Sequence, residues 1–341
     1  MAKSNKKMTK KQQERKRKSR TLILLLFLTI IMFGTSTYAW FTANRVVTIN
    51  SLDVHVEASN GLQISTDAST WKSVITNADI TTNAYTGNVN QVPSDVTAVS
   101  TDGVVNTTTG RLNMYGAVID NDATTGDYTI TAALETDAAG STGKYIAFDV
   151  FLRVDTSRPI YLTTESNVSN TDATDKGLKN SARVGFVMLG NAASDSSTST
   201  LIGLNNAAAS AIIWEPNTDT HTSIVTNSVA PEYGIDVSGA STTYYGINKA
   251  IPTAQNLKQV VAGSTSYTTQ VTPTIKTVAG FDTYQTAFTL QAGVTKVRIY
   301  MWIEGQDIDC ENNATGSNIQ FNVQLSTESS ASGSSSSSSG A

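Results

Sequence analysis

Short runs in which apolar and polar residues alternate recur along most of this chain. The clearest is residues 144–154 (KYIAFDVFLRV), where Ile146 and Phe148 belong to one face of a strand and Asp149 and Arg153 to the other, which we expect to be only partly buried. Alternation with a period of two indicates half-buried β-strands. Further runs of this kind are residues 46–56, 112–119, 128–134, 183–189, 296–303 and 319–325.

These strands predict an all-β fold, an antiparallel jelly roll or β-sandwich with long loop insertions and few short helices. We expect one domain over residues 40–325, with loop-like residues at 80–110 and an insertion or smaller subdomain at about 191–280. Helix signals are confined to the Ala-rich residues 204–213 and to a short turn within 248–261. The Ser-rich residues 326–341 are expected to form a flexible tail.

The first 39 residues have the order of a secretory signal peptide. Residues 1–20 carry ten Lys or Arg and one acidic residue, and residues 21–34 form an apolar h-region. A small-residue exit ends at Ala39, so we expect signal peptidase to cut the Ala39–Trp40 bond. The mature protein is then secreted and extracellular, at the cell surface or in a matrix.

The same segment allows an uncleaved anchor. Residues 21–43 number 23, and about 20 residues suffice for a helix to span the hydrocarbon core. Tyr38, Trp40 and Phe41 would then lie at the outer interface, which aromatic rings prefer. Under this alternative the protein is attached to the membrane through its N-terminal segment only.

Charge is divided unequally along the chain. The net charge is −4, yet beyond residue 20 there are 14 basic and 27 acidic side chains. Nucleic acids and anionic lipid headgroups bind basic faces. Neither is therefore an expected partner of the exported part.

Residues that carry catalytic chemistry are scarce. His55 and His221 are the only histidines, and neither has a neighbouring nucleophile or a zinc-binding companion motif. Cys310 is the only cysteine, so no intramolecular disulfide can form, and the acidic residues around it would raise the pKa of its thiol. We expect no enzymatic activity, with Cys310 either a tolerated structural residue or part of an intermolecular disulfide.

An acidic turn follows the predicted strand at 296–303. Glu304, Asp307, Asp309 and Glu311 place carboxylates at near-alternate positions, as calcium-binding loops do, although the spacing does not match an EF-hand. Two alternatives follow: a calcium site, or a solvated acidic turn without a ligand. No other cofactor is expected.

Several segments together resemble the TasA/camelysin-like secreted proteins of Gram-positive-type bacteria. The resemblance rests on the signal followed by residues 38–41 (YAWF), on residues 50–54, on the central run 145–154 and on residues 297–310. It implies a jelly-roll subunit that signal peptidase processes and that polymerises into extracellular fibres of a biofilm matrix. The segment 191–280 and the Ser-rich tail have no counterpart in this resemblance.

In that family the segment freed by signal cleavage becomes a strand that enters the next subunit, so the expected partner is a second copy of the chain. Residues 40–50 (WFTANRVVTIN) are compatible with such a strand, which gains affinity from main-chain hydrogen bonds and specificity from alternate side chains. The alternative is that residues 46–49 form the first strand of their own sandwich. The candidate interface residues are Trp40, Phe41, Val46, Val47 and Ile49.

A second class of function is consistent with the same composition. The protein would then be a membrane-anchored or released cell-surface module that binds a glycan or another protein. Trp71 and Trp214 are its candidate contact residues, and the alternative for each of them is packing in the core.

Overall fold

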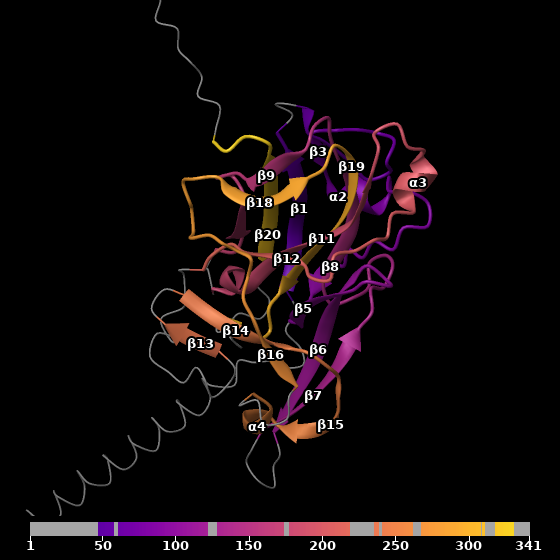
Figure 1. Cartoon of the computed structure of the whole chain (residues 1–341). Helices are drawn as coiled ribbons and strands as arrows, with labels where there is room; N and C mark the ends of the chain where they lie inside the picture. Colours follow the sequence, from indigo (N-terminus) through magenta and orange to yellow (C-terminus); the bar gives the residue numbers. More distant parts are fainter. Residues whose placement is uncertain are drawn as a thin grey trace, which may run out of the picture. The chain divides into compact units, whose positions relative to one another are not determined.

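The computed structural model describes residues 47–57, 61–121, 128–173, 177–218, 235–238, 241–261, 267–307, 309–310 and 318–330 (Figure 1). Contacts divide the chain into two units, residues 1–39 and residues 40–341, and the second holds all of the described residues. The predicted signal peptide and the Ala39–Trp40 cleavage site lie outside the described residues. So do Phe41, Val46, His221, Glu311 and residues 331–341.

The first of two large sheets contains both the first and the last strand of the domain. Its order is β18-β9-β20-β1-β3, with β10 also paired to β20 and β4 also paired to β1. These strands are β1 (Val47–Val56), β3 (Val74–Ile75), β4 (Asp95–Val96), β9 (Arg158–Leu162), β10 (Asn167–Asn170), β18 (Gln285–Leu290) and β20 (Asn318–Ser326). Ser326, which the sequence placed in the tail, is thus the last residue of β20.

The second large sheet has the order β17-β12-β11-β19-β8-β2. Its strands are β2 (Gln63–Ser65), β8 (Ile146–Val154), β11 (Ala182–Ala192), β12 (Ile212–Glu215), β17 (Ile275–Lys276) and β19 (Gly293–Ile303). The chain crosses between the two sheets from β8 to β9, from β18 to β19 and from β19 to β20. The expected all-β fold is confirmed. Among the described strand pairs, β1 with β20 and β12 with β17 are parallel, and the others are antiparallel.

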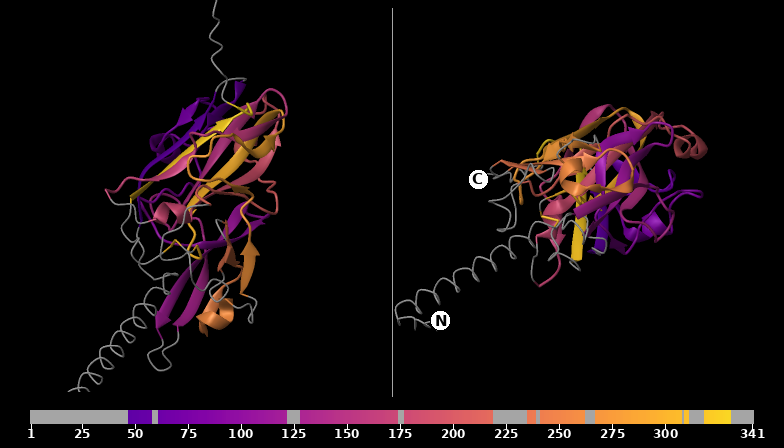
Figure 2. Two further views of the ribbon diagram at one scale, coloured as in Figure 1. Left: turned by 90° about the vertical axis from the view of Figure 1, so that its left-hand side faces the viewer. Right: turned by 90° about the horizontal axis from the view of Figure 1, so that it is seen from below.

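Two smaller sheets complete the strand content. One has the order β15-β7-β6-β5, and the other β13-β14-β16. In Figure 2 the magenta β6–β7 hairpin lies beside the orange β15 and α4. Their bounds are β5 (Ser100–Asn106), β6 (Arg111–Asn121), β7 (Tyr128–Glu135), β13 (Ile235–Ser238), β14 (Ser241–Ile247), β15 (Ile251–Asn256) and β16 (Thr268–Val271).

Helices are short, as expected. They are α2 (Asn77–Thr81), the 3₁₀ turn η2 (Leu178–Ser181), α3 (Thr198–Ile202) and α4 (Leu257–Val261). The last confirms the short helix predicted within residues 248–261. Among the described residues, no helix has the length and apolar character needed to span a membrane.

The second large sheet is buried on both of its faces. One face packs against the first sheet, and side chains from both sheets form the main core: Leu52, Val54, Phe321 and Val323 from the first, and Phe148, Val150, Val297 and Ile299 from the second. The other face carries Tyr145, Tyr300 and Trp302, which pack under Leu112 and Met114 of β6. The expectation that this second face is only partly buried was therefore wrong except at Arg153, because the β5–β6 layer covers most of it.

The segment 191–280 is part of the body of the domain. It supplies β12 and β17 to the second sheet and β15 to the sheet of β6 and β7. The prediction that residues 80–110 are loop-like was wrong in part, since β4 lies at Asp95–Val96 and β5 begins at Ser100. In both segments the polar composition hid strands that pair with distant ones.

The helix predicted at residues 204–213 is absent from the structure. The carbonyl of Ala209 accepts from the amide of Val105, and the amide of Ala211 donates to the carbonyl of Gly103. Beyond them, β12 pairs with β11, which buries Ile213 and Trp214. Pairing with neighbouring strands therefore outweighs the helix propensity of the alanines, which is a weak local preference.

Paired valine substitutions test whether β1 is an integral strand of the monomeric domain. The side chain of Val54 in β1 is 0% exposed, whereas that of Val118 in β6 is 39% exposed. We expect Val54→Ala to lower the free energy of unfolding by about 2 kcal/mol, because a buried side chain leaves a cavity. Val118→Ala should change it by no more than about 0.5 kcal/mol. Urea unfolding of both variants measures this, and equal effects would contradict the placement of β1.

Candidate functional site

The N-terminal strand β1 lies inside the first sheet, between β20 and two very short strands. Along one side it pairs with β20 from Thr48 opposite Asn318 to Val56 opposite Leu325. Along the other side it pairs with β4 only at its start and with β3 only near its end. Among the described strands, none pairs with residues 50–53 on that second side. Figure 1 shows the indigo β1 and the yellow β20 side by side.

A bulge in β1 sets which of its side chains enter the core. The register with β20 shifts between Ile49 and Ser51, and such a shift moves the buried face by one residue. Before the bulge Val47 is buried and Ile49 packs against the core, and after it the buried residues change to even numbers. The fully buried side chains of β1 are Val47, Leu52, Val54 and Val56.

Burial of these four side chains contributes on the order of 6–12 kcal/mol. The chain nevertheless connects this strand covalently to the other described strands only at its C-terminal end, through Glu57. The amide of Glu57 donates to the carbonyl of Leu325, and the amide of Val56 donates to the carbonyl of Ser73. β1 is therefore packed firmly into the domain, although only one chain connection joins it to the other described strands.

The structure locates two of the five predicted interface residues. Val47 and Ile49 belong to β1 of their own domain, as the alternative of an own first strand predicted. Trp40, Phe41 and Val46 lie outside the described residues. Within a single chain, the chain's own β1 occupies the position between β20 and the short strands β3 and β4 that a donated strand would enter.

The acidic turn after β19 is buried, so its interpretation as a solvated turn was wrong. Glu304, Asp307 and Asp309 are each no more than 1% exposed. Glu304 accepts hydrogen bonds from the indole of Trp302 at 3.1 Å and from the amide of Gln306 at 3.2 Å. These bonds tie the turn to the end of β19.

Asp307 is held by a buried arginine. The guanidinium of Arg183 donates to Asp307, and it also donates to Glu215 at 2.8 Å. The guanidinium of Arg183 therefore already neutralises Asp307, which is one of the four carboxylates of the candidate calcium site. Among the described residues, no three carboxylate, thiol or imidazole groups converge as metal ligands. Because Glu311 lies outside them, the calcium site stays a prediction.

Burial raises the pKa values of two carboxyl groups in this turn toward neutral pH. Desolvation raises the pKa of Glu304 to about 7, against the opposing hydrogen bonds from Ser100 and Trp302. Desolvation also raises the pKa of Asp307 to about 6, although Arg183 acts in the opposite direction. Cys310, the residue after Asp309, is fully buried as well, which disfavours an intermolecular disulfide of the folded protein.

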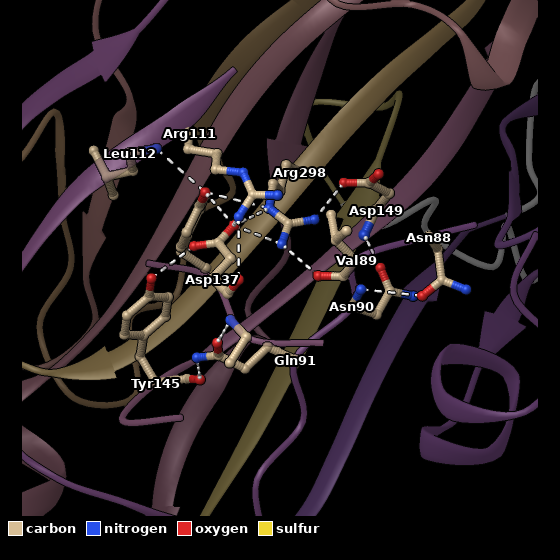
Figure 3. A network of polar contacts seen from close by, with 12 residues as sticks. Asn88, Val89, Asn90, Gln91, Arg111, Leu112, Asp137, Tyr145, Asp149 and Arg298 are labelled. Carbon is tan, nitrogen blue, oxygen red and sulfur yellow. Dashed lines mark hydrogen bonds and ion pairs between the residues drawn. The ribbon is translucent and has the colours of Figure 1, made fainter. Parts of the chain in front are cut away.

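A second charged network lies on the neighbouring strands β8 and β19 of the same sheet, under β5 and β6 (Figure 3). Arg298 of β19 and Asp149 of β8 are cross-strand partners. The guanidinium of Arg298 donates to Asp149 at 2.8 Å, to Asp137 at 2.7 Å and to the carbonyl of Val89 at 2.9 Å. The side chain of Arg298 thus connects β19 with three other parts of the chain: β8, the segment that follows α2, and the loop that follows β7.

Tyrosines and a lysine complete this network. Asp137 accepts from the hydroxyl of Tyr145 at 2.6 Å, and Asp149 accepts from the hydroxyl of Tyr85 at 2.5 Å. Lys296 lies 3.4 Å from Asp149. Burial opposes ionisation of Asp149, but Arg298 and Lys296 outweigh it and lower the pKa of this carboxyl. Asp149 is therefore held charged beside its two cations.

The remaining sequence candidates are placed in ordinary structural roles. Trp214 is fully buried, and its indole donates to Thr277 at 3.0 Å, so the alternative of core packing is confirmed for it and the surface contact is not. Trp71 is half-buried, with the guanidinium of Arg153 4.3 Å from its ring centroid. His55 is half-buried in β1 beside Val74 of β3.

The Asp149–Arg298 pair was not among the residues predicted from the sequence. A signal for it was present, because both residues stand at the centre of otherwise apolar strands, where an isolated charge is costly. Opposite charges at matching positions of two strands indicate a cross-strand pair. Asp137 gave no such signal, since it lies in a loop whose position depends on the tertiary fold.

Comparisons with known proteins add no family to this description. No family model matches the chain, and we found no match among curated proteins or solved structures.

The buried acidic turn predicts a stability that falls toward alkaline pH. The folded-state pKa of Glu304 lies above its ordinary value of 4.5, so the folded state binds more protons. Stability is then full below about 4.5 and is lost as the pH rises through about 7. We expect the free energy of unfolding to decrease by about 1–3 kcal/mol between about pH 5 and about pH 8.

Glu304→Gln should remove the part of this decrease that Glu304 contributes, because the neutral amide resembles the protonated acid, and Asp307 should account for what remains. Urea unfolding at both pH values measures it. The matched control is Glu165→Gln, since Glu165 is exposed and its loss should leave the decrease unchanged. An unaltered pH dependence in Glu304→Gln would show that Glu304 is not the titrating group.

Proposed function

We propose that this protein is a secreted structural subunit that assembles with other copies into an extracellular fibre of the cell surface or biofilm matrix. Signal peptidase cleaves the Ala39–Trp40 bond, and the freed N-terminal strand of one copy enters the first sheet of the next. The partners are signal peptidase and the chain itself. The protein contacts a membrane only through residues 1–39 before cleavage, and it has no catalytic role.

The observation that carries this proposal is the position of β1. It is the first described strand, it is buried in the interior of a sheet, and it has one covalent connection to the remaining described domain. Another copy's β1 can therefore take its place while every pairing with β3, β4 and β20 is kept. Exchange of an identical element between copies preserves the contacts of the monomer and costs little.

Exchange of a terminal strand favours an open polymer. Each copy would offer β1 to one neighbour and its own slot to another, which is a head-to-tail contact. Such a contact repeats without closing unless the rotation between copies returns to the start. The resemblance to TasA/camelysin-like proteins supports the same arrangement, with Trp40, Phe41 and Val46 preceding the strand.

The second candidate, a membrane-anchored or released surface module for a glycan or protein, loses one of its supports. Trp214 is buried, and Trp71 is covered in part by Arg153. Neither tryptophan therefore offers a free aromatic face. The fibre subunit is the function that the geometry supports better.

Cross-linking across β1 and β20 distinguishes exchange from an own strand. Asp53 and Asn322 are half-buried partners in the parallel register. In a Cys310→Ser background, we expect Asp53→Cys with Asn322→Cys to give a ladder of multimers when the mature protein, residues 40–341, is treated with a short bismaleimide. Denaturing gels read the result, and electron microscopy checks for filaments in the same sample.

The control pair is Val118→Cys with Thr131→Cys, which are partners within the β6–β7 hairpin. It should cross-link only within one chain, because no exchange involves that hairpin. The uncleaved precursor should also give only monomers with the β1–β20 pair. Filaments whose β1–β20 cross-links stay within single chains would refute strand exchange, and a persistent monomer without filaments would refute the fibre.

A further inference from the structure

A cavity of about 190 Å³ lies on the β5–β6 side of the second sheet, beside the network of Arg298. Asp149, Lys296 and Arg298 line it from the strands β8 and β19. Residues 109–111 line it from the turn between β5 and β6, and residues 203–205 line it from the loop after α3. The cavity is therefore built from segments that are far apart in the sequence.

Gly110 allows its two walls to meet. Its φ is +70°, which lies in the left-handed region, and an added Cβ would lie 2.4 Å from the side-chain oxygen of Asn205 and 2.7 Å from Leu189. A side chain at this position would push the turn away from the loop at 203–205. The close approach fixes the shape of the cavity.

The lining of the cavity carries more positive than negative charge. Three cations, Arg111, Lys296 and Arg298, line it together with one carboxylate, that of Asp149. Asp137 lies behind the cavity lining, and its carboxylate is shared between Arg298 at 2.7 Å and Arg111 at 3.4 Å. Two guanidinium groups thus share one acid. This local excess contrasts with the acidic composition of the exported chain.

The cations differ in how many of their donors are occupied. Arg298 is 2% exposed and bonds to Asp137, Asp149 and Val89, so it is engaged within the protein. Lys296 donates to the carbonyl of Ile202 at 2.7 Å and to the hydroxyl of Tyr85 at 3.3 Å. These two groups supply positive potential and have little capacity for a further ligand.

Arg111 has that capacity. Its side chain is 30% exposed, and one terminal nitrogen, Nη1, donates to the carbonyl of Asp137 at 3.3 Å. Within the described part of the chain, Nε and Nη2 have no hydrogen-bond partner. A guanidinium with free donors recognises carboxylate and phosphate oxygens through paired hydrogen bonds. Figure 3 shows the guanidinium of Arg111 beside that of Arg298, with Asp137 next to both.

We propose that this cavity binds a small organic anion whose carboxylate or phosphate group pairs with Arg111. The volume is well above the roughly 10–15 Å³ that one water molecule needs, so the cavity is larger than a bare oxyanion requires and suits a ligand up to the size of a monosaccharide. An acidic sugar, such as a uronic acid, has this size and charge. The site does not depend on strand exchange, because none of its residues belongs to β1.

Titration calorimetry of the mature protein with glucuronate, inorganic phosphate and glucose tests the site. We expect saturable binding of glucuronate that weakens as salt is added, because the attraction is electrostatic. Glucose should not bind, since it lacks the anionic group. Binding of phosphate as tight as that of glucuronate would keep the anion site but refute the role of the sugar ring. Equal binding of glucose, or no binding of either anion, would overturn the proposal.

Two variants locate the binding to this cavity. Arg111→Gln should weaken glucuronate at least tenfold, whereas Arg153→Gln, a half-buried arginine outside the cavity, should leave the affinity unchanged. Because Arg111 also contacts Asp137, a second variant avoids the network. Thr109 is exposed on the cavity rim, and Thr109→Glu adds repulsion there, so it should weaken binding several-fold without lowering the melting temperature. Unchanged affinity in both variants contradicts the assignment.

Discussion

The burial of the second sheet on both faces is the constraint on which the rest of the structure depends. Its inner face meets the first sheet in the main core, and its outer face lies under β5 and β6. A sheet covered on both sides has no solvated face on which charged groups can remain hydrated. Every ionised group on its strands must therefore find a partner inside the protein. Arg298 with Asp149, and Arg183 with Glu215 and Asp307, meet that requirement.

These buried pairs fasten segments that β-pairing alone does not hold. Arg298 bonds to groups from β8, from the segment after α2 and from the loop after β7. Arg183 connects β11 with Glu215 at the end of β12 and with the turn after β19. Buried ion pairs add little net stability, but removal of one partner is costly. Their role here is better described as fixing which loops cover the sheet.

The strands were predictable from sequence where one face is apolar and the other polar. β1, β8, β19 and β20 were recognised in this way, and the buried face of β1 after its bulge followed from Leu52, Val54 and Val56. The outer face of β8 was misjudged, because Asp149 and Arg153 look solvated in a sequence that does not reveal the β5–β6 layer. The Ala-rich residues 204–213 were misjudged for a related reason, since only distant partners make residues 212–215 a strand.

The candidate sites were predictable to a smaller degree. The acidic turn was found as a cluster, but its burial depends on Arg183, which lies more than a hundred residues earlier in the chain. The cavity beside Arg111 had no sequence signal, because its walls come from six separate segments. Local patterns specify strands, whereas sites of this kind arise from the topology that brings distant residues together.

The parallel pairing of β1 and β20 has a mechanical consequence. Because the two strands run in the same direction, the start of β1 at Val47 and the end of β20 at Ser326 lie at opposite ends of their shared ladder. A pulling force between these two points is directed along the strands and loads the hydrogen bonds of the ladder together, in shear. An antiparallel pair pulled from one end would open its bonds one at a time. The first and last strands are thus arranged to resist tension along the chain.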